Sequence, residues 1–192
     1  MTQSKDNLQI NAGWLSAAVH CPSPNFNQRP AEQLPRLLVV HNISLPPGKF
    51  GGGYIEDFFV NQLDANADPY FATIDTLKVS AHLLIKRTGQ LVQFVSFDQR
   101  AWHAGQSHYA GCDNCNDFSI GIELEGADLI PYTEQQYQQL ARVAAALIAY
   151  YPDMRPDQIT GHSDIAPQRK TDPGPAFNRD YFNRLLTMEI QG

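Results

Sequence analysis

The order of apolar and polar residues along the chain predicts strands interspersed with helices. Residues 37–40 form a continuous apolar run, which is typical of a buried central strand. Two further apolar runs flank Thr88 and Gly89, a pattern that predicts a hairpin. Strands are expected at residues 14–19, 37–40, 81–86, 91–95, 118–124 and 158–160.

Three segments predict helices. The most clearly defined helix opens at Thr133, where Gln136, three residues later, completes a capping box. Shorter helices are expected at residues 54–63 and 179–188. The apolar stripe of the helix that opens at Thr133 consists of Tyr137, Leu140, Val143, Ala144, Leu147, Ile148 and Tyr151.

The predicted fold class is α/β, a single domain with a central mixed β-sheet flanked by helices. A hairpin needs antiparallel strands and helical crossovers join parallel ones, so the sheet should contain both. A length of 192 residues suits one domain better than two. Residues 1–12 lack periodicity and are expected to form a flexible tail, and residues 13–190 form the domain.

Charge and hydropathy narrow the classes of function. The formal net charge is −6, whereas nucleic-acid-binding domains usually carry a basic face. No apolar run approaches the 18 or so residues of a membrane span, and residues 1–7 are polar, unlike a secretory signal. We therefore expect no nucleic-acid or membrane partner and a cytoplasmic location.

The chain contains three cysteines, an odd count that fits a reducing compartment. Cys112 and Cys115 form a C-x-x-C pair, which could belong to a zinc knuckle or a redox centre. One such pair without a second is weak evidence, so a surface loop with two free thiols is favoured.

The segment 161–174 gathers polar side chains in a stretch that reads as too irregular for a helix or a strand. Loops of this kind often carry binding and catalytic groups. It contains His162 and Asp172, and His41 directly follows the first buried strand, so these three side chains could converge on one metal ion. Alternatively, His41 is a histidine satisfied in the core and Asp172 is a turn residue.

Glu123 is a candidate general base. It lies in the apolar strand at residues 118–124, where alternation places it on the same face as Glu125. Burial raises the pKa of a carboxylate, and a base that works near neutral pH needs a raised pKa. The alternative is that this face is solvated and Glu123 has no chemical role.

Other histidines are less specific. His82 starts a strand, which favours a place in the core or beside a site. His103 follows Trp102 in a loop of small residues, and His108 is a further candidate; Trp102 could stack on a sugar or fill the core. The chain lacks H-E-x-x-H, G-x-S-x-G, Walker and Rossmann motifs, which argues against helical zinc peptidases, serine hydrolases and nucleotide enzymes.

Five blocks of sequence, in order, resemble one enzyme family. Together with the intervening chain from about residue 14 to 186, they are similar to the zinc-dependent N-acetylmuramoyl-L-alanine amidases, which share a fold with peptidoglycan recognition proteins. Within that family the resemblance is strongest to the cytosolic branch that acts on 1,6-anhydro sugars. The blocks are residues 38–48, 79–82, 100–105, 116–126 and 160–175.

The resemblance implies one zinc ion per chain, held by His41, His162 and Asp172. It implies hydrolysis of the amide between (1,6-anhydro-)N-acetylmuramic acid and L-alanine of the stem peptide in cell-wall recycling, which lowers the signal for β-lactamase induction. A zinc-bound water would be the nucleophile and Glu123 the general base and acid. Lys170 and zinc would stabilise the oxyanion.

Asn42 and Trp102 would line the substrate groove. Lys78 and Asn114 stand where close relatives carry arginines, so Lys78 keeps a charge without a bidentate fork and Asn114 carries none. The expected partner is an anhydromuropeptide, bound by a monomer. Two alternatives are a lysis-type amidase that acts on intact murein and a muropeptide-binding protein without activity; the polar start disfavours the first, and the full set of ligands disfavours the second.

Overall fold

The centre of the molecule is a six-stranded sheet with the strand order β12-β5-β11-β6-β7-β3. This is seen in a computed structural model that describes residues 8–31 and 33–192. The first four strands in that order are parallel to their neighbours, β7 is antiparallel to β6, and β3 is parallel to β7. The predicted α/β fold with a central mixed sheet is therefore confirmed. The strands are β12 (Ile159–Gly161), β5 (Leu37–Ile43), β11 (Ser119–Glu125), β6 (Leu83–Ile85), β7 (Leu91–Gln93) and β3 (Val19–His20).

The two long central strands, β5 and β11, pair in parallel and place His41 beside Glu123. Alternate residues of β11 pack into a core that includes α2 (Glu134–Tyr150), and these are Ile120, Ile122 and Leu124. Because side chains alternate along a strand, Glu123 and Glu125 face the other side of the sheet. The sheet thus keeps one face apolar and leaves carboxylates on the other.

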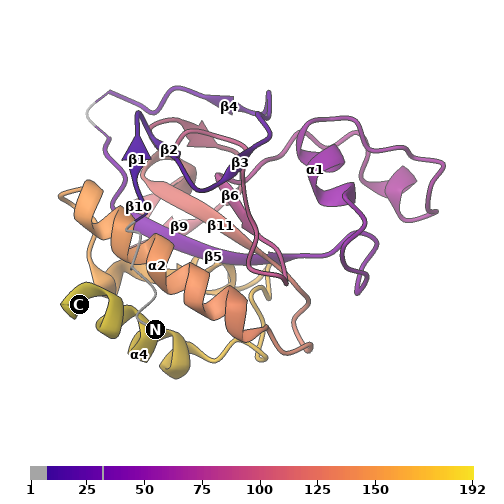
Figure 1. The fold of residues 1–192 in the computed structure, drawn as a ribbon. Coiled ribbons are helices and arrows are strands. Elements are labelled where there is room, and N and C mark those ends of the chain that lie inside the picture. Colours follow the sequence, from indigo (N-terminus) through magenta and orange to yellow (C-terminus); the bar gives the residue numbers. More distant parts are fainter. Residues whose placement is uncertain (1–7, 32) are drawn as a thin grey trace.

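Two helices cover the apolar face (Figure 1). The capping box predicted at the start of α2 is present, since Thr133 accepts from the Gln136 backbone N–H and the Gln136 side chain accepts in return. Beside α2 lies α4 (Arg179–Gln191), which buries Phe182 and Leu186 against the same core. Within the described residues, no helix has the length and apolar character needed to cross a bilayer.

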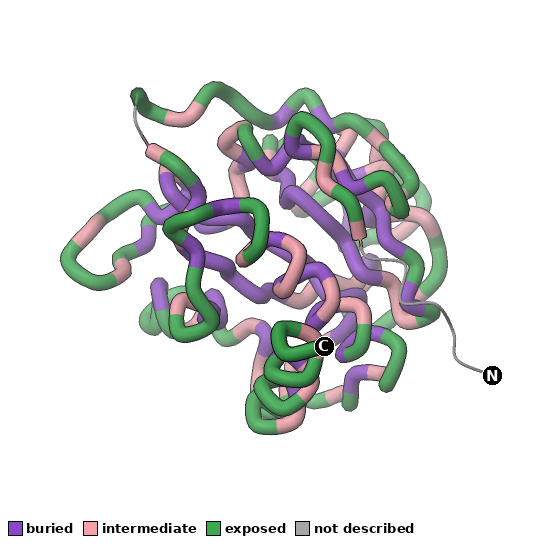
Figure 2. Tube along the Cα trace, turned by 60° about the vertical axis from the view of Figure 1, so that its left-hand side comes forward, coloured by how far each residue is buried: buried purple, intermediate pink, exposed green. Residues whose placement is uncertain are grey.

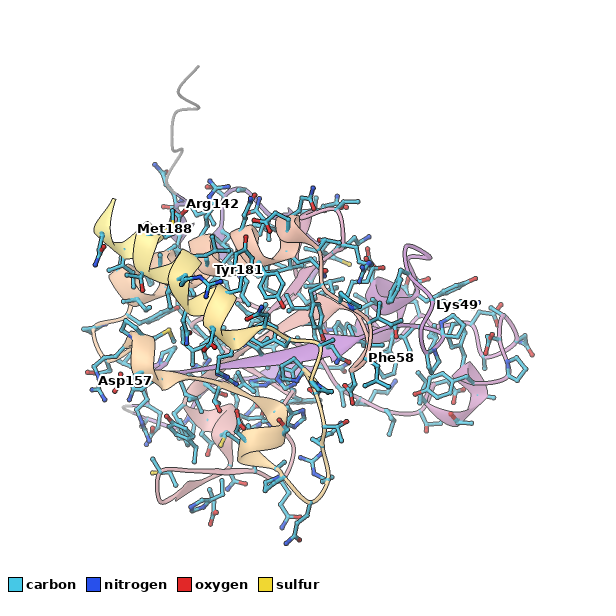
Figure 3. All side chains as sticks on the ribbon, turned by 90° about the horizontal axis from the view of Figure 1, so that it is seen from below. Lys49, Phe58, Arg142, Asp157, Tyr181 and Met188 are labelled. Carbon is cyan, nitrogen blue, oxygen red and sulfur yellow. The ribbon has the colours of Figure 1, made fainter. Side chains whose placement is uncertain are left out.

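A small lobe beside the sheet contains α1 (Tyr54–Phe59) and the 3-10 turn η1 (Phe71–Thr73). In Figure 3, Phe58 and Lys49 mark this lobe at the opposite end of the molecule from Met188. The helix predicted at residues 54–63 ends early because Asn61 adopts a left-handed backbone, with φ +61°. Aromatic residues build the lobe's own core against the sheet, among them Phe58, Phe59, Phe71 and Phe94.

Part of the predicted N-terminal tail is ordered. Ile10–Asn11 form β1, which pairs with β2 (Trp14–Leu15), and Leu8 and Ile10 pack against the main core. Residues 1–7 of that tail lie outside the described residues. The strand predicted at residues 14–19 is divided into β2 and β3, since its buried residue Leu15 and its exposed residue Val19 belong to different sheets.

The remaining elements are short and lie around the sheet, whose buried strands form the interior in Figure 2. They set the positions of loops that contribute to the site described below. They are β4 (Phe26–Asn27), β8 (Arg100–Ala101), β9 (His108–Tyr109), β10 (Cys112–Asp113), η2 (Cys115–Asp117), η3 (Pro156–Gln158) and α3 (His162–Ile165).

Candidate metal centre

Three side chains converge beside the ends of β5 and β12, one from β5 and two from the segment 161–174. His41 Nδ1 lies 3.0 Å from His162 Nδ1, and Asp172 Oδ2 lies 3.0 Å from the first and 3.1 Å from the second. Both histidines are buried and Asp172 is half-buried. Among the described residues, these three form the one group of histidine, cysteine or carboxylate side chains that could hold a metal ion.

The segment 161–174 is more regular than its sequence suggested. It begins with α3, whose first residue is His162. The Asp164 carboxylate accepts from the Gly161 N–H and the Thr160 hydroxyl, each at 2.8 Å, and so caps this turn. The prediction that no helix occurs here was wrong, because a four-residue helix carries no apolar periodicity.

Hydrogen bonds on the far side of each ring determine which nitrogen faces the cluster. His162 Nε2 lies 3.0 Å from the Ala104 carbonyl oxygen and must donate to it, which leaves a lone pair on His162 Nδ1. Burial lowers the pKa of His41 to about 4, so its imidazole is neutral near pH 7. Neutral imidazoles and a carboxylate are ligand types that a divalent cation takes.

The spacing of the three atoms also fits a cation. A tetrahedral site with metal–nitrogen bonds of about 2.0–2.1 Å places its ligand atoms roughly 3.3 Å apart. The observed separations of 3.0, 3.0 and 3.1 Å are close to that value. Lone pairs directed at one another without a cation between them would repel, so the arrangement favours bound metal.

The loop that carries Asp172 is clamped through its neighbour. The Pro173 carbonyl accepts from the Tyr132 hydroxyl at 2.7 Å and from Asn42 Nδ2 at 3.1 Å. Asn42 Nδ2 also donates to Asp128 Oδ1 at 2.8 Å. Asn42 was predicted to bind substrate, but its amide N–H groups donate to Asp128 and Pro173 and hold this loop.

Glu123 lies on the same face of the sheet, next to the cluster. Its side chain is buried, and its Oε2 atom has no hydrogen-bond partner among the described residues. Burial raises the pKa of Glu123 well above its usual value, the nearby Asp172 carboxylate adds to this, and the Lys170 ammonium opposes it. The half-buried Lys170 is therefore close enough to act on Glu123 electrostatically.

The other predicted substrate-binding residues lie in separate loops. Trp102 is half-buried, and its indole Nε1 donates to Asn27 Oδ1 at 2.7 Å, which fixes the ring. Lys78 is exposed in the segment between η1 and β6. Asn114 is exposed and adopts a left-handed backbone with φ +58°.

Comparison with known proteins places the chain in a family. Residues 30–175 match the model of the N-acetylmuramoyl-L-alanine amidase family. The chain belongs to the N-acetylmuramoyl-L-alanine amidases. It is 57% identical over 182 residues to the 1,6-anhydro-N-acetylmuramyl-L-alanine amidase AmpD of Escherichia coli K12. The matched residues cover 95% of this chain and 99% of that relative. The resemblance inferred from the sequence blocks is confirmed, and the chain is an amidase.

Solved structures of amidases share the fold. A crystal structure of a selenomethionine derivative of AmpD matches with a TM-score of 0.91 and 56% identity, over 93% of this chain and 99% of that one. A more distant amidase, AmiD of E. coli, was solved with the substrate anhydro-N-acetylmuramic acid-L-Ala-D-γ-Glu-L-Lys. It matches with a TM-score of 0.58 and 28% identity, over 93% of this chain and 65% of that one.

Two further histidines and the C-x-x-C cysteines lie outside the candidate metal centre. His82 is fully buried and accepts from the Gly121 N–H at 2.9 Å, in agreement with its predicted place in the core. The exposed His108 pairs with Asp113. Cys112 and Cys115 are free thiols as expected, but Cys115 is buried in a small core with Leu37 rather than lying on the surface.

Sequence reasoning missed the residues that support the ligands. Tyr132 and Asp128 hold the Asp172 loop, and the Ala104 carbonyl orients His162. A backbone carbonyl leaves no signal in a sequence, and the tyrosine reads as an ordinary core residue. Their roles depend on where the loops meet in space.

Proposed function

We propose that this amidase hydrolyses the amide between 1,6-anhydro-N-acetylmuramic acid and the L-alanine of a stem peptide, with one zinc ion held by His41, His162 and Asp172. The observation that carries the proposal is the convergence of three metal-ligand atoms within 3.1 Å of one another, beside the Glu123 carboxylate, whose Oε2 is unpaired. The 57% identical relative in E. coli has a name that states this activity.

The ligand set is two imidazoles and one carboxylate, so a zinc ion held there would keep a net positive charge and would supply Lewis acidity toward a carbonyl and a water. Hydrogen bonds within the protein hold each of the three ligand side chains in position. His41 and His162 are fixed by their outer nitrogens, and Asp172 by the clamped loop.

Glu123 acts as general base and then as general acid. Its carboxylate accepts the proton of the attacking water and returns it to the amine of L-alanine as the amide breaks. A pKa raised by burial suits both steps, since the group must take up a proton and release it again within one turnover. The unpaired Oε2 atom gives the water a place to donate.

Lys170 stabilises the negative charge that develops on the scissile carbonyl oxygen. The loss of one such stabilising group typically slows an enzyme by about 100- to 1,000-fold. The side chain lies two residues before Asp172 in the same loop and acts electrostatically on both Glu123 and His41.

Substrate recognition involves residues around the centre. Trp102 packs near the sugar, with its ring held by Asn27. Asn42 contributes the oxygen of its amide to the stem peptide, and Lys78 offers an exposed ammonium to its carboxylates. We place this chemistry in a monomeric cytoplasmic enzyme of cell-wall recycling, in which residues 13–190 form the zinc amidase domain.

The choice of substrate separates this proposal from action on intact murein. We expect a higher kcat/KM on soluble anhydromuropeptides than on intact sacculi at equal amide concentration, because a domain with formal net charge −6 has no basic surface excess to draw it to a polyanionic wall. Released stem peptide quantified by mass spectrometry measures both rates. Faster cleavage of sacculi would contradict the recycling role.

A further inference from the structure

A chain of hydrogen bonds leads away from the candidate metal centre on the side of His41. His41 Nε2 lies 2.9 Å from His103 Nδ1, and His103 Nε2 lies 3.1 Å from Ser119 Oγ. Ser119 Oγ in turn lies 2.6 Å from the carbonyl oxygen of Cys115. The chain therefore links a candidate ligand on β5 to the backbone just before β11.

The direction of each bond follows from its last member. A carbonyl oxygen only accepts, so the single hydroxyl hydrogen of Ser119 points to Cys115 and Ser119 Oγ must accept from His103 Nε2–H. An imidazole ring with one N–H has its lone pair on the other nitrogen, so His103, whose Nε2–H is donated to Ser119, carries that lone pair on Nδ1, which faces His41. His103 Nδ1 therefore accepts from His41 Nε2–H, and His41 keeps its own lone pair on Nδ1.

Packing holds His103 where this bond requires it. A Cβ atom on Gly121 would lie 2.4 Å from Cγ of the His103 ring, so the ring occupies the space that any other residue at 121 would fill. The backbone is fixed as well, because Asn116 Oδ1 accepts from the N–H groups of His103 at 3.1 Å and Ala104 at 2.8 Å. The same dipeptide orients both histidines of the centre, since the Ala104 carbonyl accepts from His162 Nε2.

We propose that His103 is a positioning residue of the metal centre, which accepts the Nε2–H of His41 and thereby makes His41 present Nδ1 to the metal. This inference rests on the metal centre of the proposed function. Ser119 sets the direction of the hydrogen bonds between these side chains, and Asn116 sets the position of the backbone at His103. Outer partners of this kind orient metal-binding histidines and fix their tautomers.

Two substitutions at His103 distinguish its role as a hydrogen-bond acceptor from a role in filling the pocket. His103→Phe keeps a ring in the pocket but removes the acceptor, whereas His103→Asn places Oδ1 where Nδ1 lies and keeps it. We expect the zinc dissociation constant, measured by competition with a chromophoric chelator, to rise by about 10- to 100-fold in His103→Phe. His103→Asn should recover most of that loss, and His108→Phe, at an exposed histidine away from the chain of bonds, should bind like the parent.

Parental zinc affinity in His103→Phe would overturn the proposal and indicate a space-filling role. Equal losses in the two His103 variants would also overturn it, because the acceptor that His103→Asn restores would then have no effect. If His103→Phe does not fold, the zinc-loaded parent decides. Its long-range ¹⁵N–¹H spectrum should place the ring protons of His41 and His103 on Nε2, and a proton on Nδ1 of His103 would overturn the proposal. A parent that binds no zinc would instead contradict the metal centre itself.

Discussion

The carboxylate of Glu123 is buried, although an ionised carboxylate is more stable in water. It lies in β11 next to His41, and its side chain is buried beside the candidate metal centre with one oxygen unpaired. A group in such surroundings destabilises a fold unless it is protonated or paired. Glu125, two residues further on the same face, is satisfied by contrast, because it accepts from the N–H groups of Gly51 and Arg87.

We expect Glu123→Gln to lower turnover of an anhydromuropeptide by at least about 100-fold, because an amide cannot take up the proton of the attacking water. The variant should keep the parental zinc content and gain stability, since burial of an unpaired carboxylate is removed. Steady-state kinetics, metal analysis and urea unfolding measure the three quantities. The matched variant Glu125→Gln should keep far more activity, and near-parental turnover in Glu123→Gln would remove Glu123 from the mechanism.

At this scale, the sequence predicts residues whose role follows from their type and place. Glu123 could be recognised because a carboxylate interrupts an apolar strand, and His41 because it follows a buried run. His103 could be named only as a candidate. Its role depends on the rotamer that brings its Nδ1 to His41 and on the space above Gly121, and neither is written in the local sequence.

Among the elements, the loop after α3 depends on contacts from other parts of the chain. The Ser163 N–H donates to the Asp172 carbonyl at 2.9 Å, and Tyr132 and Asn42 both donate to the Pro173 carbonyl. These bonds fix the backbone on either side of the Asp172 side chain. The precision of this candidate ligand therefore comes from neighbouring elements rather than from its own loop.

We expect Tyr132→Phe to lower the free energy of unfolding by about 0.5–1.5 kcal/mol, the usual worth of one hydrogen bond, and to weaken zinc binding because the Asp172 loop loses a donor. Tyr181→Phe is the matched control, since it removes a hydroxyl bonded to Glu134 on the surface. Urea unfolding and chelator competition on both variants measure the difference. Equal zinc affinity in Tyr132→Phe and the parent would show that the clamp does not position Asp172.

Elements were predictable in proportion to their length. The helix α2 shows a capping box and an apolar stripe over several turns, so its start and type are clear from sequence. The four residues of α3 offer no stripe, and α1 ends where Asn61 turns left-handed, which the apolar spacing does not indicate. Short elements take their form from the surroundings instead.

At the scale of the whole molecule, four histidines form one cluster, of which two belong to the candidate site and two lie behind it. His41 contacts His103 and His162 through near-perpendicular rings, and His103 also contacts His82 at 5.6 Å between ring centroids. Desolvation lowers the pKa of His82 to about 3 and that of His41 to about 4. The folded protein therefore keeps His82 and His41 neutral at pH values where the unfolded chain protonates them.

This cluster predicts how stability depends on pH. Between the unfolded value of 6.5 and about 3, the unfolded chain binds more protons than the folded protein, so the free energy of unfolding of the metal-free protein should fall as the pH is lowered through that range. We expect His82→Gln to reduce this slope by up to about 1.4 kcal/mol per pH unit, the contribution of one proton. Urea unfolding from pH 7 to pH 4 measures it, and an unchanged slope would contradict the neutral state of His82.

The central claim is that His41, His162 and Asp172 hold a zinc ion on which amide hydrolysis depends. The most direct test measures zinc content together with the masses of the products from an anhydromuropeptide, before and after chelation and for Asp172→Ala. We predict one zinc per chain, products that are the anhydro sugar and the free stem peptide, loss of turnover on chelation with recovery on added zinc, and depleted metal in Asp172→Ala. Parental zinc content in Asp172→Ala after dialysis, or undiminished turnover by the metal-free protein, would contradict the account.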